Sequence, residues 1–215
     1  MQEDELERSA VPKATVARLV LYLRELQQLA RGGGTHVRSG VLADRLGLTD
    51  SQVRRDLSHL GQFGRRGVGY PVGELSRGIR SVLGTDRRWR VVLIGAGNLG
   101  QALSGYKGFA EQGFDLAAVF DSEPTKVGTV IHGYRILPAN ELEAFIESTG
   151  DVQMAIVAVP ASQACSIVAR LSELGVQGIL NFAPVSVRRY CGDAVVLEVD
   201  LALELQRLAS GIVRR

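Results

Sequence analysis

The sequence predicts an α/β protein made of two modules, a small helical module followed by a larger one with a parallel sheet. The central observation is the stretch VVLIGAGNLG at residues 91–100, where an apolar run enters a turn of glycines. Behind it, short apolar runs alternate with segments of helical periodicity, the pattern of a doubly wound sheet. In front of it, residues 13–60 carry helical periodicity. A chain of 215 residues has room for two small domains.

Charge is unevenly distributed, although the formal net charge is only +2. Residues 31–90 hold twelve arginines and five acidic residues, whereas residues 91–215 hold nine basic and thirteen acidic residues. This asymmetry indicates two modules with different partners. A charged patch is often only a solvated face, so the arrangement of the arginines has to decide whether the first module binds DNA.

The composition argues against several classes of protein. No apolar run is long enough to span a bilayer, and the acidic, polar start MQEDELERSA does not resemble a secretory signal. Cys165 and Cys191 are far apart, which predicts two free thiols and a reducing, cytoplasmic location. The three histidines are scattered, so we expect no metal site; they are His36, His59 and His132.

Residues 13–60 predict three helices. The run KATVARLVLYLRELQQLA has apolar residues at helical spacing, and RGGG stops it. The segment SGVLADRLGL predicts a short second helix with Ser39 as its N-cap and Val41 on the buried side. Thr49 and Gln52 have the spacing of a capping box and mark the start of a third helix. Two short helices joined by a glycine turn indicate a helix-turn-helix.

The third helix, DSQVRRDLSHLG, separates into an apolar face and a polar face. Val53, Leu57 and Leu60 share the apolar face. The polar face carries groups that hydrogen-bond base edges and phosphates; its residues are Ser51, Gln52, Arg55, Ser58 and His59, with Arg54 at its flank. A surface helix that faces only solvent would show the same pattern, so this helix alone does not establish DNA binding.

The segment QFGRRGVGYPV follows the third helix and contains several glycines, which permit sharp turns and close approach of the backbone to a surface. Arg65 and Arg66 lie at its tip, between what we predict to be two short strands. A hairpin behind a recognition helix is the wing of a winged helix, and arginines at its tip suit the narrow minor groove. A plain basic hairpin is the alternative. Helix-turn-helix and wing together favour DNA binding.

The glycine turn at residues 91–100 predicts a dinucleotide site. A lone G-x-G-x-x-G pattern is a weak signal, but here the strand RVVLI precedes it and the amphipathic segment LGQALSGYKGF follows it as a helix. The glycines allow the turn, the approach of a pyrophosphate and the packing of helix on strand. The helix N-terminus supplies amides to the phosphates. We expect the cofactor to contact Gly95, Ala96, Gly97, Asn98, Leu99 and Gly100.

Asp121 follows at the end of a second strand, FDLAAVFD, about twenty residues beyond the glycines. A carboxylate there accepts hydrogen bonds from ribose hydroxyls and repels a 2′-phosphate, which favours NAD(H) over NADP(H). The neutral ring of NADH should bind better than the cationic ring of NAD, because burying an unpaired charge is unfavourable. The alternative is that Asp121 only caps the turn DSEP.

Strands and helices continue to alternate behind Asp121. NELEAFIE and SQACSIVARLSELG predict helices, and VQMAIVAVP and VQGILNFAP predict buried strands. The pattern indicates the doubly wound parallel sheet of a Rossmann fold, which binds ligands beyond the carboxyl ends of its strands. The residues expected there, Val159, Pro160, Asn181, Phe182 and Ala183, line the cofactor pocket in this interpretation. The alternative is that these segments are simple strand-ending turns.

After a short strand, AVVLEV, the segment DLALELQRLASGIV predicts a terminal amphipathic helix. The sheet is complete before this helix begins. A spare apolar face usually packs on another surface, often that of a partner subunit.

An ordered set of motifs runs through nearly the whole chain: PKATVARLVLYLREL, SQVRRDLSHLGQFGRRGVGY, GAGNLGQALSGY, FDSEPTKVG, LNFAPV and VDLALELQRL. The set resembles the Rex family of bacterial redox-sensing transcriptional repressors. The resemblance implies a homodimer with a winged-helix DNA-binding domain at residues 1–84, a Rossmann NAD(H)-binding domain at 85–198 and a domain-swapped dimerisation helix at 199–215. It also implies binding to palindromic operator DNA that NADH relieves, with NAD a weaker competitor.

The resemblance implies an allosteric switch as well. Asp200 would pair with Tyr106 in the DNA-competent dimer, and with Arg24 of the other subunit once NADH is bound. Tyr106 is expected on the helix that opens at the glycine turn. The sequence departs from the family at His59-Leu60, where Tyr-Phe is common. The contact that residue 59 makes with the operator is therefore expected to differ from that of the family.

Two other functions remain open from the residues. An oxidoreductase would need an acid–base group beside the nicotinamide, and the predicted strand ends offer no obvious His or Lys. A module that binds coenzyme A or another nucleotide is compatible with the fold but matches Asp121 poorly. We therefore expect that the chain is not an enzyme, and that it binds the dinucleotide as a regulatory ligand without converting it.

Overall fold

The computed structural model describes residues 11–61, 63–64 and 67–214. The chain divides into two compact units, residues 1–87 and 88–215, and each is described by itself. None of the helices in the described ranges is long and apolar enough to cross a bilayer.

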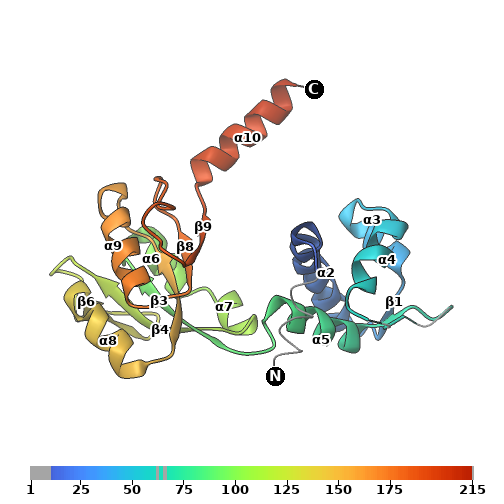
Figure 1. Cartoon of the computed structure of the whole chain (residues 1–215), viewed down its shortest axis with the longest axis horizontal. Helices are drawn as coiled ribbons and strands as arrows, with labels where there is room; N and C mark the ends of the chain where they lie inside the picture. The colour runs from blue at the N-terminus through green and yellow to red at the C-terminus, as the bar shows by residue number, and fades with distance from the viewer. Residues whose placement is uncertain (1–10, 62, 65–66, 215) are drawn as a thin grey trace. The chain divides into compact units, whose positions relative to one another are not determined.

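The first unit is a small helical domain with a short two-stranded sheet (Figure 1). Its core consists of fully buried apolar side chains such as Leu19, Leu42, Leu57, Leu75 and Ile79. The elements that its described residues form are α2 (Lys13–Arg31), β1 (His36–Val37), α3 (Ser39–Leu46), α4 (Asp50–Ser58), β2 (Tyr70–Pro71) and α5 (Val72–Leu83).

Two predictions about α3 are wrong in detail. Ser39 is the first residue of the helix, and the cap position belongs to Arg38, which makes no side-chain cap. Val41 is 41% exposed, because the buried stripe of this short helix runs through Leu42 and Ala43 instead. The predicted cap of α4 is confirmed, since the Thr49 hydroxyl accepts a hydrogen bond from the amide of Gln52.

The strands of the predicted hairpin are also different from expectation. Gly61, Phe63 and Gly64 belong to no strand, and β2 pairs antiparallel with β1, which lies before the helix-turn-helix. Gly69 permits this pairing. Its φ is 101°, and its backbone lies so close to Val37 that a Cβ on residue 69 would overlap the carbonyl oxygen of Val37. Arg65 and Arg66, the predicted tip, lie outside the described residues.

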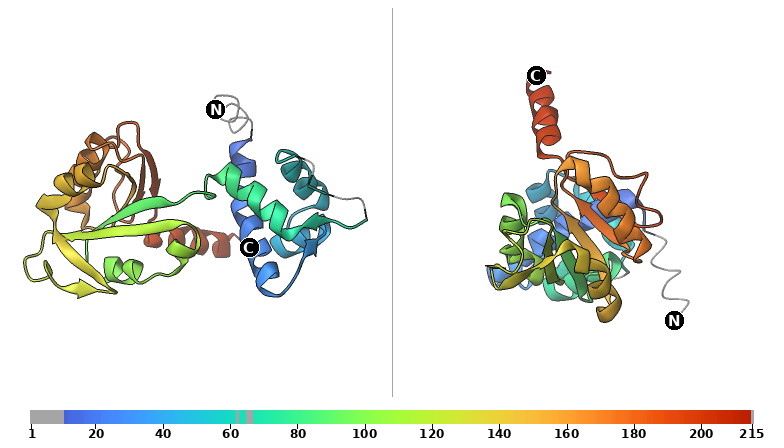
Figure 2. Two further views of the ribbon diagram at one scale, coloured as in Figure 1. Left: turned by 90° about the horizontal axis from the view of Figure 1, so that it is seen from below. Right: turned by 90° about the vertical axis from the view of Figure 1, so that its left-hand side faces the viewer.

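The second unit, whose residues 88–214 are all described, contains a seven-stranded sheet in the order β5-β6-β4-β3-β7-β8-β9. All neighbouring strands are parallel except β5, which pairs antiparallel with β6. Figure 2 shows the long strands β3 and β4 side by side. The strands are β3 (Trp89–Ile94), β4 (Phe114–Asp121), β5 (Val130–Ile131), β6 (Tyr134–Pro138), β7 (Val152–Val157), β8 (Gly178–Asn181) and β9 (Val195–Glu198).

Helices lie on both faces of this sheet, as predicted for a doubly wound fold. Side chains of α8 and α9 contribute to one apolar cluster, and side chains of α6 and α7 to the other. These helices are α6 (Asn98–Ser104), α7 (Gly108–Glu111), α8 (Leu142–Thr149, after a 3₁₀ turn at Ala139–Glu141) and α9 (Ala161–Glu173). The chain changes direction between β3 and β7, so the ends of these strands form the switch point where such sheets bind ligands.

The helix predicted behind the glycine turn is broken into α6 and α7. Gly105 ends α6, and a Cβ on it would lie 2.9 Å from the His132 ring. Tyr106 therefore lies between the two helices and not on the first one, and it is 61% exposed.

The terminal helix α10 (Leu201–Val213) follows β9, as the sequence predicts (Figure 1). Every residue of it is exposed, including the apolar stripe of Leu201, Leu205, Leu208 and Ile212. Asp200 caps it, because its Oδ1 accepts hydrogen bonds from the amides of Ala202 and Leu203 at 2.9 and 3.1 Å.

Candidate dinucleotide cleft and DNA-binding surface

The glycine turn between β3 and α6 has the close contacts that its glycines predict. Gly95 has a φ of 100°, and a Cβ there would overlap the carbonyl oxygen of Ala158 on the neighbouring strand connection. A Cβ on Gly100 would overlap the carbonyl oxygen of Gly95, so only glycine lets α6 pack on the turn. Gly97 has nothing within 4 Å of its ideal Cβ position, which leaves its backbone open to a ligand.

A cavity of about 230 Å³ opens at this turn. It brings together five of the predicted cofactor residues: Gly95, Gly97, Asp121, Val159 and Pro160. The sequence did not predict the other lining residues, which are Ile94, Ser122, Glu123, Lys126, Ala139, Ala158, Gln163 and Ile167. Glycine backbone, the Asp121 carboxylate and an apolar wall from the segment after β7 thus meet at the switch point of the sheet.

Asp121 is 8% exposed and is held by three donors. The amides of Ala96 and Glu123 donate to its Oδ2 and Oδ1 at 2.6 and 2.8 Å, and Lys126 Nζ lies 3.2 Å from Oδ2. Burial alone would raise the pKa of Asp121, but these hydrogen bonds and the charge of Lys126 lower it below its ordinary value. The carboxylate is therefore anionic, and it caps the following turn while it also lines the cavity.

Lys126 is the residue that sequence reasoning missed most clearly. We expected no Lys at the pocket, yet Lys126 lines the cavity with its side chain 37% exposed. The available signal was its position in the turn that follows Asp121 (DSEPTK). Its ammonium group is paired with Asp121, so it is not a free acid–base group.

The predicted residues at the end of β8 do not line this cavity. Asn181 is fully buried, and its amide nitrogen donates to the carbonyl oxygens of Ala183 and Val185 at 3.2 and 3.1 Å. Ala183 is buried, and Phe182 packs partly buried against the cluster beneath α6 and α7. These residues hold the loop after β8 in place.

The polar face of α4 is arranged largely as predicted. Val53 and Leu57 are buried in the core, and Leu60 packs against it. The exposed residues on the other side are Ser51, Arg54, Arg55, Ser58 and His59. Gln52 is only half-exposed, because its amide nitrogen donates to Asp56 at 2.9 Å.

A groove lies between the starts of α3 and α4 and the segment that leads to β2. It has a volume of about 700 Å³ and is lined by Arg38, Ser39, Gly40, Asp50, Arg54, Gly64, Gly67, Gly69 and Tyr70. Arg54 and Asp50 form an ion pair of 2.6 Å at its edge. Arg38 and Tyr70 are therefore additional candidates for contacts to DNA that the helical pattern did not reveal.

Two family models match the chain, one in each unit. The model described as "Putative DNA-binding protein N-terminus" matches residues 10–58, and the model described as "CoA binding domain" matches residues 86–185.

Curated relatives align with nearly the whole chain. The redox-sensing transcriptional repressor Rex of Carboxydothermus hydrogenoformans is 44% identical over 204 residues, which are 95% of this chain and 97% of that protein. The corresponding repressor of Rhodopirellula baltica is 44% identical over 97% of this chain and 87% of its own length. The chain belongs to the Rex family. This confirms the expected resemblance and makes the chain a redox-sensing transcriptional repressor, not an enzyme.

Solved structures of another Rex protein share the fold. The crystal structure of RSP in complex with β-NAD⁺ and operator DNA has a TM-score of 0.87 and 32% identity, covering 94% of this chain and 92% of that one. RSP in complex with β-NADH has a TM-score of 0.82 and 30% identity, covering 94% of both chains. The predicted fold class, a DNA-binding unit followed by a Rossmann-like unit, is confirmed.

The three residues of the predicted Rex switch are in different surroundings. Arg24, on α2, is exposed, and its Nε lies 3.9 Å from Glu25. Tyr106 stacks edge-to-face on Phe109 at 5.1 Å, and Asp200 caps α10. Among the described residues, no hydrogen bond joins Tyr106 to Asp200, and Arg24 belongs to the other unit.

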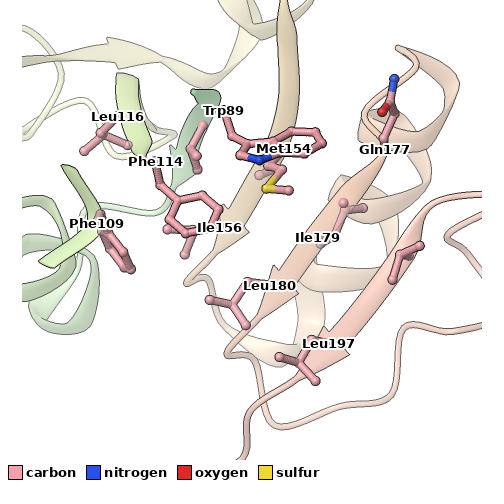
Figure 3. Close-up of a pocket in the computed structure, with 14 residues that line it drawn as sticks. Trp89, Phe109, Phe114, Leu116, Met154, Ile156, Gln177, Ile179, Leu180 and Leu197 are labelled. Atoms are coloured by element: carbon pink, nitrogen blue, oxygen red, sulfur yellow. The ribbon is translucent and has the colours of Figure 1, made fainter. Parts of the chain in front are cut away.

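A second, apolar cavity of about 580 Å³ lies on the sheet of this Rex chain (Figure 3). It is lined by Trp89, Val91, Phe109, Phe114, Leu116, Met154, Ala155, Ile156, Gln177, Gly178, Ile179, Leu180, Val195 and Leu197. Val195 and Leu197 are 76% and 62% exposed, so apolar surface extends from the cavity onto β9. No group of three or more potential metal ligands occurs in the described part of the chain.

Proposed function

We propose that this Rex protein binds operator DNA through α4 and the segment after it, and binds NADH in the cleft at Gly95, with NADH releasing the DNA. The observation that carries this proposal is the cleft, which is lined by an open glycine turn and by the anionic Asp121. The other unit of the same chain has the exposed polar face of α4. The RSP structures with β-NAD⁺, operator DNA and β-NADH support the same activity.

The proposed cofactor contacts are those of the glycine turn, of Asp121 and of the neighbouring strand ends. Asp121 would accept hydrogen bonds from the adenosine ribose, which favours NADH over NADPH. Val159 and Pro160 would form the wall beside the dinucleotide, whereas Asn181, Phe182 and Ala183 would act by holding the loop after β8. A metal has no role in this proposal.

The proposed DNA contacts divide between the major and the minor groove. Residues of α4, with His59 directly after it, would read base edges and phosphates in the major groove; they are Ser51, Gln52, Arg54, Arg55, Ser58 and His59. Arg65 and Arg66 would enter the minor groove. A repressor that binds a bacterial operator acts in the cytoplasm.

We propose a homodimer in which the C-terminal dimerisation segment 199–215, which contains α10, packs on a second copy. A helix exposed along its whole length cannot bury its apolar stripe within its own unit, and the apolar cavity on the sheet offers a second surface of the same kind. A dimer also matches a palindromic operator, with half-sites an integral number of helical turns apart. In this dimer Asp200 would be paired with Tyr106 in the DNA-bound state, and it would pair with Arg24 of the second copy when NADH binds.

The test is a ligand titration of the full chain on labelled operator DNA, recovered first by selection from random duplexes. NADH should release the DNA, NAD and NADPH should do so only at higher concentration, and coenzyme A should have no effect. Release by coenzyme A at lower concentration than NADH would overturn the choice of ligand. Failure to enrich any duplex would overturn the DNA-binding function.

A further inference from the structure

Asp56, on the inner side of the proposed recognition helix α4, is the most heavily hydrogen-bonded buried carboxylate described in the first unit. It is 1% exposed. Arg18 of α2 donates hydrogen bonds to both carboxylate oxygens of Asp56, from Nε to Oδ2 at 2.6 Å and from Nη2 to Oδ1 at 2.8 Å. Tyr22 donates to Oδ2 at 2.7 Å and Thr15 to Oδ1 at 3.2 Å. Three residues of α2 thus fix one carboxylate of α4.

The remaining partner of Asp56 belongs to the polar face of α4. Gln52, one turn earlier, donates from Nε2 to Asp56 Oδ1 at 2.9 Å. An anionic carboxylate only accepts hydrogen bonds, so the amide nitrogen of Gln52, and not its carbonyl oxygen, must face Asp56. The chemistry of the pair therefore sets which way round the carboxamide lies.

The carbonyl oxygen Oε1 of Gln52 is left as an acceptor. No hydrogen-bond donor to it is found among the described residues, and Gln52 follows Ser51 on the polar face of α4. In the major groove, cytosine N4 and adenine N6 are the exocyclic amino groups that donate to such an acceptor. Guanine and thymine present acceptors at the corresponding edge, so they cannot donate to Oε1.

We propose that Asp56 is a positioning residue that holds Gln52 with its carbonyl oxygen toward the DNA, so that Gln52 reads an amino group of cytosine or adenine at one position in each half-site. This inference rests on the proposed function, because it assumes that α4 enters the major groove. It assigns Gln52 a base class and gives the buried network a role beyond stability.

The experiment is selection of binding sites from random duplexes by the full chain and its variants, followed by affinity measurements on single-base variants of the selected site. The parent should enrich cytosine or adenine at one position of each half-site. Gln52→Met, which keeps the size of the side chain but has no carbonyl, should lower that preference roughly tenfold. Asp56→Asn should lower it at the same position, because an asparagine amide no longer dictates the orientation of Gln52.

Tyr22→Phe is the matched control. It removes a different donor from the same carboxylate and leaves Gln52 untouched, so it should lower the melting temperature while the base preference stays unchanged. Arg18→Lys is a second, milder variant of the network. Lysine keeps the charge but does not bond both oxygens as arginine does, so the carboxylate can rotate away from Gln52, whereas Tyr22→Phe leaves both arginine bonds in place. Arg18→Lys should weaken the same preference even if Asp56→Asn does not fold. The effects of Gln52→Met and Arg18→Lys on that base should be non-additive, since both act through Gln52.

Two results would overturn the inference. One is an unchanged base preference in Gln52→Met. The other is a network variant, Asp56→Asn or Arg18→Lys, that lowers affinity equally for all sequences, since this is what a purely structural network would do. If the parent enriches no duplex at all, the proposed DNA-binding function fails first, and the two failures are thereby distinguished.

Discussion

At the scale of single residues, the two roles that the sequence presented as alternatives for Asp121, turn cap and ribose ligand, are compatible with each other. Its oxygens accept three hydrogen bonds, and a carboxylate has about four acceptor positions. One acceptor position, on Oδ1, is thus left for a ribose hydroxyl while the turn remains capped. The neighbouring Lys126 offsets part of the negative charge, so discrimination against a 2′-phosphate depends on the carboxylate being nearer to the ribose than the ammonium group.

We expect Asp121→Asn to weaken NADH binding and to narrow the ratio of NADH to NADPH affinity. The amide keeps the size of the side chain but has no charge, and its nitrogen cannot accept the hydrogen bond that Oδ2 receives from Ala96. The loss of one hydrogen bond to a charged carboxylate corresponds to ~1–3 kcal/mol of binding free energy. Fluorescence titration with both nucleotides measures the ratio. Asp115→Asn, which alters a surface ion pair with Arg88 instead, is the control, and an unchanged ratio in Asp121→Asn would leave Asp121 as a turn cap only.

Asp56 predicts a specific dependence of stability on pH. Burial alone would raise its pKa, but hydrogen bonds from Arg18, Tyr22 and Gln52 lower it from 3.8 to about 2. A carboxylate whose pKa is lower in the folded state stabilises that state above its unfolded pKa, and this stabilisation is lost as the pH falls toward the folded pKa. The difference corresponds to ~2 kcal/mol.

Urea unfolding of the parent and of Asp56→Asn between pH 7 and pH 2.5 measures this contribution. The free energy of unfolding of the parent should fall below pH 4 by ~2 kcal/mol more than that of the variant, because only the parent loses the Asp56 anion. Asp44→Asn, a change at an exposed carboxylate of α3, should follow the parent curve. Parallel curves for the parent and Asp56→Asn would show that folding does not lower the pKa of Asp56.

At the scale of elements, the parts predicted well are those whose contacts are local or periodic. The apolar run of β3, the glycine turn and the end of β4 at Asp121 follow from sequence patterns, because strand burial and turn geometry act over a few residues. The close approach of the His132 ring to Gly105, where α6 ends, could not be predicted, since that ring comes from a distant turn. The pairing of β1 with β2 was missed for a similar reason: each strand has two residues, too few to show a period.

The same distinction applies to the candidate site. Asp121 was predicted because it stands at a fixed distance behind the glycines. Lys126 was missed because its approach to Asp121 depends on the course of the turn between them. Asn181 was expected in the pocket from its position at a strand end. Its side chain instead donates hydrogen bonds to its own loop. The spacing of residues does not determine which way such a side chain points.

The terminal helix α10 gives a prediction about assembly. Leu205 and Leu208 are 68% and 62% exposed, and packing of this stripe on a second copy would bury them. Leu205→Glu combined with Leu208→Glu should therefore convert the protein to monomers and weaken operator binding, because a monomer engages one half-site at a time. Sedimentation velocity measures the first effect and band-shift titration the second. Ser210→Glu, on the opposite side of α10, is the control, and a double variant that remains dimeric would exclude this stripe from the interface.

At the scale of the whole molecule, the two units have to communicate, because the ligand cleft and the polar face of α4 lie in different units. A ligand shifts an equilibrium only by its different affinity for the two states. A contact made in one state only is therefore required. Asp200 is suited to such a contact, since its Oδ1 caps α10 while no hydrogen bond to Oδ2 is found among the described residues. Arg24 is equally suited, because the ion pair found for its exposed guanidinium among the described residues is a long one, 3.9 Å to Glu25.

We expect Asp200→Ala to bind NADH but to respond to it weakly, and Arg24→Ala to hold operator DNA at NADH concentrations that release the parent. An arginine–carboxylate pair made across the dimer only in the NADH-bound state would supply the ~1–3 kcal/mol typical of allosteric coupling. Measured as the NADH concentration for half-release of labelled operator, the two effects should be non-additive in a double-mutant cycle, because both variants remove the same pair. Arg77→Ala, at an exposed arginine of α5, should leave that concentration unchanged. Strictly additive effects, or normal release of Arg24→Ala, would exclude this pair as the switch while leaving the cofactor and DNA sites intact.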